Sequence, residues 1–306
     1  MQVYRSIDQL PDFKNSVITI GTFDGVHQGH QKIISALKKE AAKMQGESVI
    51  ITFHPHPRRI VNPQYHLQLI NTLDEKIDLL RQAGIDHLVV VPFTEDFSEQ
   101  SADEYIENFL IKNFHPASII IGYDHHFGKD RIGNYKLLEE KAEHFKYNLV
   151  EIPQHLLNEI AVSSTKIREA ILASDIVTAN QLLGYSFSFE GTVVQGDQLG
   201  RTIGYPTANL QYTDEDKIRL GHGVFAVYAE VAGIRKKGMM SIGTRPTLNK
   251  SEEKVEVNIF DFDDTIYGQK MRVTVEHFLR GQEKYLSLDV MKDQLHKDKE
   301  RSLQLL

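Results

Sequence analysis

Two histidines three positions apart, His27 and His30, close a glycine-rich stretch, Gly21–His30. The apolar run before this stretch predicts a buried strand, and the apolar residues after it recur at helical spacing. A glycine-rich turn from a strand into a helix is where phosphates bind in α/β proteins, because free backbone N–H groups and the helix dipole point at the ligand. Gly25 and Gly29 let the backbone come close, and both histidines can donate hydrogen bonds to phosphate oxygens. A plain helix cap and a metal site are the alternatives.

The composition narrows the class of protein. The chain has 306 residues, 41% of them hydrophobic, which suggests two domains with ordinary cores. A net charge of -7 and a pI of about 6.1 argue against nucleic acid as a partner. The chain has no cysteine, which excludes disulfides and thiolate sites. With no signal-like N-terminus and no run of membrane-spanning length, we expect a soluble, cytoplasmic protein without a membrane partner.

Strands and helices alternate through the first half, which predicts an α/β fold with a parallel sheet covered on both faces. The expected strands are the apolar runs 17–20, 49–53, 88–93, 119–121 and 148–152. Ligands bind such sheets at the carboxyl ends of the strands. The first, second and fourth runs end in unusual loops, Gly21–His30, Phe53–Pro57 and Gly122–Gly128. We therefore expect these loops to converge on one edge of the sheet.

Each loop has a simpler interpretation as well. His54-Pro55-His56-Pro57 could be a rigid, extended exit from a strand, because proline restricts itself and its predecessor. Asp124-His125-His126 could form a metal cluster with His27 and His30. Zinc sites use fixed ligands on stable elements, and nothing in this spacing singles out a tetrahedral set.

The segment Ser163–Arg168 follows the last strand of the first half and precedes an expected helix, about Lys166 to Ala173. A hydroxyl there caps the helix in the simplest interpretation. Capping does not explain Lys166 and Arg168 in the first turn, where the helix dipole disfavours cations. An anion docked at this turn would offset that cost, which favours triphosphate binding.

Three of these stretches together resemble the adenylyltransferase half of bacterial bifunctional riboflavin kinase/FMN adenylyltransferase (FAD synthetase). They are Gly21–His30, Phe53–Pro57 and Ser163–Arg168. The resemblance implies a Rossmann-like nucleotidyltransferase domain that binds ATP through Gly21, Phe23, Asp24, His27, Gly29 and His30, with Ser164, Thr165 and Arg168 at the phosphates. It places the flavin at Pro55, His56, Pro57 and Asp124. His125 stands where the family usually has an aromatic residue.

The pattern of elements changes in the second half of the chain. We expect a helix over 174–184, ended by a glycine, before the change. Short alternating strands, expected at 224–231, 239–242, 255–260 and 271–278, then predict an antiparallel β-barrel. An amphipathic helix from about Leu288 follows, with Met291, Leu295 and Leu303 as expected packing residues. We place the domain boundary near Ser186, which gives domains 1–185 and 186–306.

Gly196, Gly200 and Gly204 predict a flap that folds over phosphates. After Pro206 the chain should be extended, so Thr207 and Asn209 face the same side. A hydroxyl and an amide oxygen suit Mg²⁺, which takes few protein ligands. A glycine-rich hairpin followed by an ordinary strand is the alternative.

Glu256 is the candidate base of the second half. Val255, Val257 and Ile259 share one face of the expected strand, and Glu256 shares the other face with Asn258. A solvated glutamate on a strand is the commoner interpretation of such a pattern.

The resemblance to this family extends to the second half of the chain. Leu199–Leu210, Gly243–Thr247, Glu256 and Phe278–Arg280 resemble the riboflavin kinase half of the same family, and Leu199–Leu210 matches its pattern without a gap. The resemblance implies Mg-ATP on Thr207 and Asn209, and ATP contacts from Gly196, Gly200, Gly204 and Pro206. It implies Glu256 as the catalytic base and Arg280 near the flavin or its lid.

The implied chemistry has two steps. Riboflavin takes the γ-phosphoryl group of Mg-ATP to give FMN, and FMN then takes the adenylyl group of a second ATP to give FAD and pyrophosphate. His27, His30 and Arg168 would stabilise the charge that grows on the triphosphate. Two rivals are a nucleotidyltransferase for another phosphorylated cofactor precursor, and a flavin- or nucleotide-binding regulator without catalysis.

Overall fold

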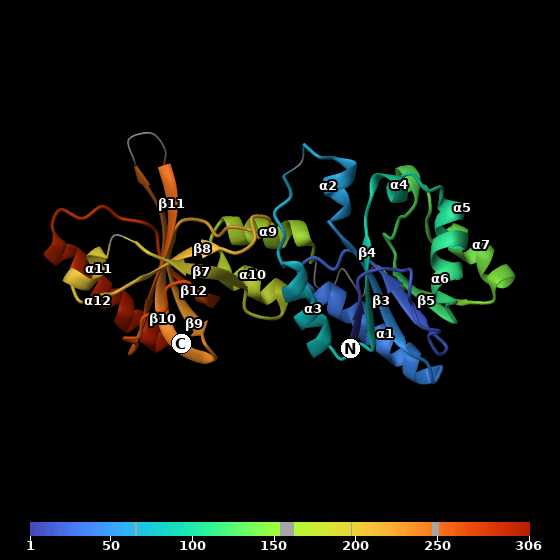
Figure 1. Cartoon of the computed structure of the whole chain (residues 1–306), viewed down its shortest axis with the longest axis horizontal. Helices are drawn as coiled ribbons and strands as arrows, with labels where there is room; N and C mark the ends of the chain where they lie inside the picture. Colours follow the sequence, from blue (N-terminus) through green and yellow to red (C-terminus); the bar gives the residue numbers. More distant parts are fainter. Residues whose placement is uncertain (65, 154–161, 197, 247–250) are drawn as a thin grey trace. The chain divides into compact units, whose positions relative to one another are not determined.

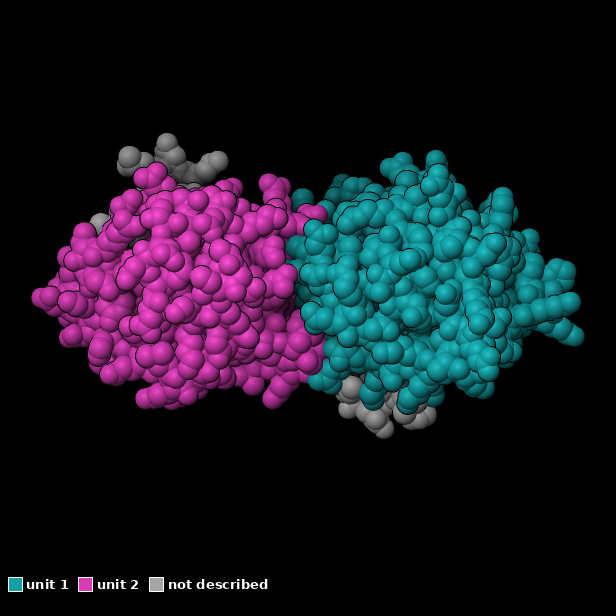
Figure 2. Space-filling view, turned by 60° about the horizontal axis from the view of Figure 1, so that its bottom comes forward, with its two compact units in different colours: residues 1–163 teal, residues 164–306 magenta. Residues whose placement is uncertain are grey.

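The computed structural model describes residues 1–64, 66–153, 162–196, 198–246 and 251–306. Thr247, the last residue of the Gly243–Thr247 motif, lies outside the described residues. The chain divides into two compact units, 1–163 and 164–306, coloured separately in Figure 2. In the described ranges no helix is both long and apolar enough to cross a membrane.

Unit 1 is built on a six-stranded sheet in the order β1-β4-β3-β2-β5-β6, with every neighbouring pair parallel (Figure 1). Its strands are β1 (Gln2–Tyr4), β2 (Val17–Ile20), β3 (Ser48–His54), β4 (His87–Pro92), β5 (Ser118–Gly122) and β6 (Asn148–Ile152). The five expected strands are confirmed, and the short edge strand β1 was not predicted.

The helical segments of unit 1 connect these strands. They are α1 (Gln28–Lys43), α2 (Pro57–Val61), α3 (Leu73–Gln82), α4 (Glu95–Ser98), α5 (Ala102–Glu104), η1 (Tyr105–Ile111), α6 (Lys112–Phe114), η2 (Lys129–Arg131) and α7 (Tyr135–Phe145). Thr72 and Glu75 form a capping box at the start of α3, and Ser101 and Glu104 form one at the start of α5.

Both faces of the sheet are buried, as the continuous apolar strands predict. Ile18 and Ile20 point to a core that includes Tyr105 and Phe109 of η1. Val17, on the opposite face, points to a core that α1 and α3 complete. The sheet therefore has helices on both sides, and its carboxyl edge carries the loops after β2, β3 and β5.

Unit 2 begins with two helices, α9 (Ser164–Leu172) and α10 (Ile176–Leu183). Gly184 ends α10 in the left-handed conformation at φ 78°, as its sequence position predicts. Asn180 of α10 donates to the carbonyl oxygen of Val275 and accepts from the backbone N–H of Phe187. These bonds explain why α9 and α10 group with the barrel, earlier in the chain than the expected boundary.

The rest of unit 2 is the expected antiparallel barrel, closed in the order β10-β11-β8-β7-β12-β9. Its elements are β7 (Ser188–Val194), α11 (Leu199–Thr202), β8 (Ala208–Tyr212), β9 (Gly223–Val231), β10 (Ile234–Pro246), β11 (Ser251–Ile259), β12 (Lys270–Arg280) and α12 (Leu288–Leu305). The expected packing role of Leu303 is wrong, because its side chain is 43% exposed. The buried residues of α12 are Asp298 and Ser302.

Candidate functional site

The loop after β2 folds back on itself before α1 begins. Phe23, Gly25 and Val26 have φ values of 47°, 90° and 37°, in the left-handed region that favours glycine. His27 is the N-cap of α1, and its Nδ1 accepts a hydrogen bond from the backbone N–H of His30 at 3.4 Å. The turn from strand into helix is thus confirmed, and His27 caps the helix in addition to any ligand role.

The rings of His27 and His30 lie against each other. Their centroids are 3.7 Å apart with an interplanar angle of 14°, and the Phe23 ring lies 5.0 Å from that of His30. Burial lowers the pKa of His30 well below its ordinary value, and the neighbouring His27 and Lys76 lower it further. His30 is therefore neutral at physiological pH. Its buried Nδ1 has no hydrogen-bond partner within the described ranges.

Asp24 ties this loop to the start of α3. It is 2% exposed, and its Oδ1 accepts hydrogen bonds from the backbone N–H groups of Ile70 and Asn71 at 3.0 and 3.3 Å. Phe23 is equally buried and belongs to the core beneath α1. Both side chains shape the loop, and their expected contact with ATP remains a prediction.

Lys76 of α3 lies beneath the same loop and was not predicted. Its ammonium donates to the carbonyl oxygen of Thr22 at 2.6 Å. A signal was present in the sequence, because Lys76 occupies the inward stripe that Leu73, Ile77 and Leu80 define at helical spacing.

The other two loops leave the same edge of the sheet, since β3 and β5 flank β2 in parallel register. His56 caps α2 by accepting from the backbone N–H of Arg58 at 3.2 Å. Asp124 is exposed, and its carbonyl oxygen lies 2.9 Å from Nδ1 of His126. The expected convergence of the three loops is confirmed, while the flavin contacts of Pro55, His56, Pro57 and Asp124 stay predictions.

His125 lies between Asp124 and His126 in the loop after β5. Burial lowers its pKa to about 4, helped by the charges of His126 and Arg131. Its buried Nε2 has no hydrogen-bond partner among the residues described. As for a metal cluster, the described part of the chain holds no group of three His, Cys, Asp or Glu side chains that could bind an ion.

Ser164, Thr165 and Arg168 lie in the first turns of α9, which belongs to unit 2. Their expected place at the phosphates of the site in unit 1 remains a prediction.

In the barrel, Glu256 of β11 pairs directly with Asn209 of β8 across the antiparallel ladder. Residues directly opposite project to the same face, so the carboxylate and the amide are neighbours. A Cβ on Gly196 would overlap the side chain of Asn209, and one on Gly200 would overlap the carbonyl oxygen of Tyr205. The fold thus places two of the predicted glycines, Gly196 and Gly200, against the Pro206–Asn209 segment.

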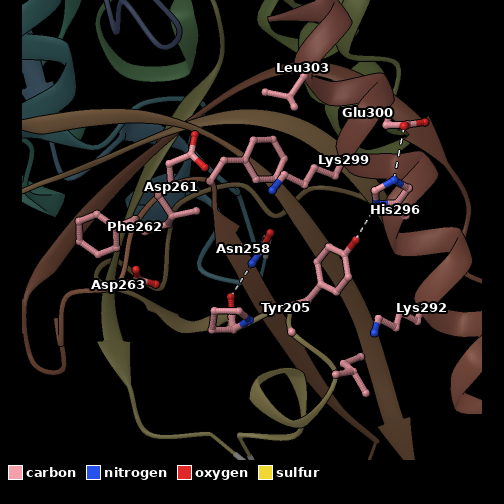
Figure 3. Close-up of a pocket in the computed structure, with 15 residues that line it drawn as sticks. Tyr205, Asn258, Asp261, Phe262, Asp263, Lys292, His296, Lys299, Glu300 and Leu303 are labelled. Atoms are coloured by element: carbon pink, nitrogen blue, oxygen red, sulfur yellow. Dashed lines mark hydrogen bonds and ion pairs between the residues drawn. The ribbon is translucent and has the colours of Figure 1, made fainter.

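A cavity of about 540 Å³ opens beside this segment (Figure 3). Gly204 and Pro206 line it from one side, and Asn258 donates from Nδ2 to the carbonyl oxygen of Pro206 at 2.6 Å. This bond explains why Asn258 is buried although it shares the polar face of β11.

Helix α12 supplies the opposite wall of the cavity. Nδ1 of His296 lies 3.3 Å from the hydroxyl of Tyr205, and Nε2 of His296 lies 3.4 Å from Glu300. The ammonium of Lys299 lies 5.3 Å from the centre of the Phe260 ring. Sequence reasoning missed His296 and Lys299, although Lys292, His296 and Lys299 recur at helical spacing.

Arg280, expected at the flavin or its lid, ends β12 with its guanidinium held by Asp298 of α12. This contact joins the helix to the barrel, and a contact with flavin remains a prediction.

Comparison with known proteins accounts for both units. A family model described as FAD synthetase matches residues 10–166, and one described as riboflavin kinase matches residues 183–306. A bifunctional riboflavin kinase/FMN adenylyltransferase of Buchnera aphidicola is 36% identical over 97% of this chain and 96% of its own. Those of Haemophilus influenzae and Escherichia coli are 35% and 31% identical, covering 92% and 96% of this chain and 92% and 93% of their own.

A solved structure named "Macrolide-efflux Protein from Streptococcus pneumoniae" has a TM-score of 0.87 to this chain at 31% identity, covering 98% of each. The match to this structure extends over both units, as do the matches to the curated relatives. The chain belongs to the bifunctional riboflavin kinase/FMN adenylyltransferase family.

Proposed function

We propose that the chain converts riboflavin to FMN and FMN to FAD, each step using one ATP. The observation that carries the proposal is the presence of both family domains, in order, along one chain. Each unit also carries its own polar site: the loop Gly21–His30 in unit 1, and in unit 2 the Glu256–Asn209 pair, two residues along β11 from Asn258, which lines the cavity.

In the kinase step, Glu256 accepts the proton of the ribityl 5′-hydroxyl. The hydroxyl oxygen then attacks the γ-phosphorus of ATP, and ADP leaves. The cavity beside Pro206 and Asn258 is where we place the nucleotide, with Gly196, Gly200 and Gly204 near its phosphates. Within unit 2, we propose that the kinase domain itself begins near Ser186.

The kinase step implies a magnesium ion, and the residues present fit one. Thr207 offers a hydroxyl and Asn209 an amide oxygen, both hard donors, and Asn209 lies directly opposite Glu256. When bound there, Mg²⁺ would neutralise charge on the phosphates. The chain's own contribution is to hold Asn209 on β8 directly opposite the base Glu256, with Thr207 just before that strand.

In the adenylylation step, the phosphate of FMN attacks the α-phosphorus of ATP and pyrophosphate leaves. The nucleophile is already anionic, so no general base is required. His30 is neutral and can donate one N–H, while the start of α1 contributes backbone N–H groups. We also assign contacts with the ATP phosphates to His27, Ser164, Thr165 and Arg168. Contacts with the flavin we assign to Pro55, His56, Pro57 and Asp124 in this site, and to Arg280 in the kinase site.

The first experiment is to incubate the purified chain with riboflavin, ATP and Mg²⁺ and to separate the flavins by chromatography over time. FMN followed by FAD supports both steps, and loss of FMN formation with a chelator supports a magnesium requirement of the kinase step. Flavin binding without turnover would identify a regulator, and FMN that is never adenylylated would overturn the assignment of unit 1.

A further inference from the structure

Lys76 is a buried lysine, which is uncommon unless its charge has a partner. Its side chain is 7% exposed, and its neighbours on α3, Ile77 and Leu80, pack into the core under the sheet. Burial lowers the pKa of Lys76 to about 8, and the nearby carboxylate of Asp24 opposes that shift. The ammonium is therefore still largely charged at neutral pH.

Besides facing the carboxylate of Asp24, this ammonium donates a hydrogen bond to a backbone oxygen at the start of the nucleotide loop. The carbonyl of Thr22 accepts from Nζ of Lys76 at 2.6 Å and from Oγ1 of Thr52, on β3, at 3.2 Å. With both bonds made, this oxygen is directed into the domain. A carbonyl directed the other way would present negative charge to an anionic triphosphate.

The loop beyond Thr22 has a backbone that must be held in place by its contacts. Phe23 and Val26 are non-glycine residues in the left-handed region, a strained conformation that persists only where the surrounding structure fixes it. Asp24 holds the middle of the loop, and Nε2 of Gln31 donates to the carbonyl of Val26 at 3.1 Å at its end. Lys76 holds its beginning.

Lys76 also lies close enough to His30 for its charge to act on that ring, since it contributes to the lowered pKa of His30. A fixed cation behind a loop favours an anion in front of it, because a buried charge is weakly screened.

We propose that Lys76 is a positioning residue for ATP in the adenylylation site, where it fixes the carbonyl of Thr22 inward and supplies positive charge behind the loop. This inference rests on the proposed function of unit 1. It assigns to Lys76 a role in binding the nucleotide, not the flavin.

The test compares Lys76→Met with Lys38→Met in FAD synthesis from FMN and ATP. Lys38 is a matched control, because its ammonium also donates to a backbone carbonyl, that of Ala83, at 2.7 Å, but it is exposed. We expect Lys76→Met to raise the KM for ATP about 10- to 100-fold, the loss of a hydrogen bond to a charged group. The KM for FMN and the kinase activity should stay unchanged, and Lys38→Met should match the parent chain.

A second variant tests whether the ammonium itself matters. The chain has no cysteine, so Lys76→Cys carries a unique thiol. Alkylation with 2-bromoethylamine in denaturant, followed by refolding, restores an ammonium at nearly the length of lysine. The parent chain taken through the same treatment is the control. Recovery of the KM for ATP supports the positioning role.

The outcomes separate the two proposals. A parent chain that makes no FAD from FMN overturns the proposed function and this inference with it. A parent chain that makes FAD, with a Lys76→Met variant whose KM for ATP is unchanged or whose kcat alone falls, overturns the inference and leaves the function standing. A KM for ATP that aminoethylation fails to restore, when the treated parent recovers, also overturns it.

Discussion

Arg280 and Asp298 form a two-pronged ion pair that fastens helix α12 to the barrel. Nε and Nη2 of Arg280 donate to the carboxylate of Asp298 at distances of 3.0 and 2.6 Å. Gln294 donates to the same carboxylate at 2.9 Å, and the Asp298 side chain is 5% exposed. Since α12 forms one wall of the cavity, this pair helps to hold that wall in place.

Replacing Asp298 by alanine should therefore weaken unit 2 and the kinase together. Removing one partner of a buried pair strands the other charge and costs about 3 kcal/mol. The measurement is the urea midpoint for loss of kinase activity, with adenylylation followed in the same samples. Glu190→Ala is the control, because the Glu190–Arg272 pair is more exposed, at 32% and 38%, and should cost no more than about 1 kcal/mol. A direct flavin contact would show in addition as a KM for riboflavin that rises in Arg280→Lys and stays at the parent value in Asp298→Ala, both measured without denaturant.

Glu256→Gln should separate the two activities. The glutamine keeps the size of the side chain opposite Asn209 but cannot accept the substrate proton. We expect kinase turnover to fall by about 10²–10⁴-fold, the typical contribution of a general base. FAD synthesis from supplied FMN should continue at the parent rate. Glu253→Gln, on the same strand, is the control, and a parallel fall in both activities would contradict the two-site arrangement.

Local pattern was enough to predict much of this molecule. Continuous apolar runs specified the five longer strands of unit 1. Alternation placed Val255 and Val257 in the core and Glu256 on the other face, as the structure confirms. These features depend on near neighbours in the chain, which is why the sequence alone reveals them.

Other features depend on contacts between distant segments. Lys76 and Thr22 are separated by 54 positions, and nothing local indicates that a lysine on an inward stripe reaches a carbonyl of the first loop. The ion pair of Arg280 and the burial of Asp298 likewise arise only when α12 docks on β12. Tertiary packing overrides the ordinary preference of charged residues for the surface.

His30→Ala should do the reverse of the change at Glu256. The substitution removes a neutral donor from the loop and a ring from the stack with His27. We expect adenylylation to fall by about 10²–10³-fold, as for loss of one donor to a developing negative charge, while the kinase is retained. The measurement is the rate of each step, with riboflavin supplied for the two steps in sequence and with FMN supplied for adenylylation alone. His144→Ala, an exposed histidine of α7, is the control, and retained FAD synthesis in His30→Ala would remove the first loop from the site.

His125 should make unit 1 sensitive to acid. Its folded pKa of about 4 lies below the ordinary value of 6.5, so the unfolded chain binds the proton more readily. The stabilisation by neutral His125 is therefore complete above pH 6.5 and is lost as the pH falls towards 4. Between pH 7.5 and 5, this loss amounts to about 2 kcal/mol for one group.

The substitution His125→Phe isolates this contribution, because it keeps a ring beside Phe127, whose centroid lies 5.8 Å away, and removes the titrating nitrogens. We expect its free energy of unfolding to change less between pH 7.5 and 5 than that of the parent chain. Urea unfolding at the two pH values, followed by the loss of adenylylation activity on return to a common assay pH, provides the comparison. His144→Phe should retain the parent difference, and an unchanged acid sensitivity in His125→Phe would show that the buried imidazole does not carry it.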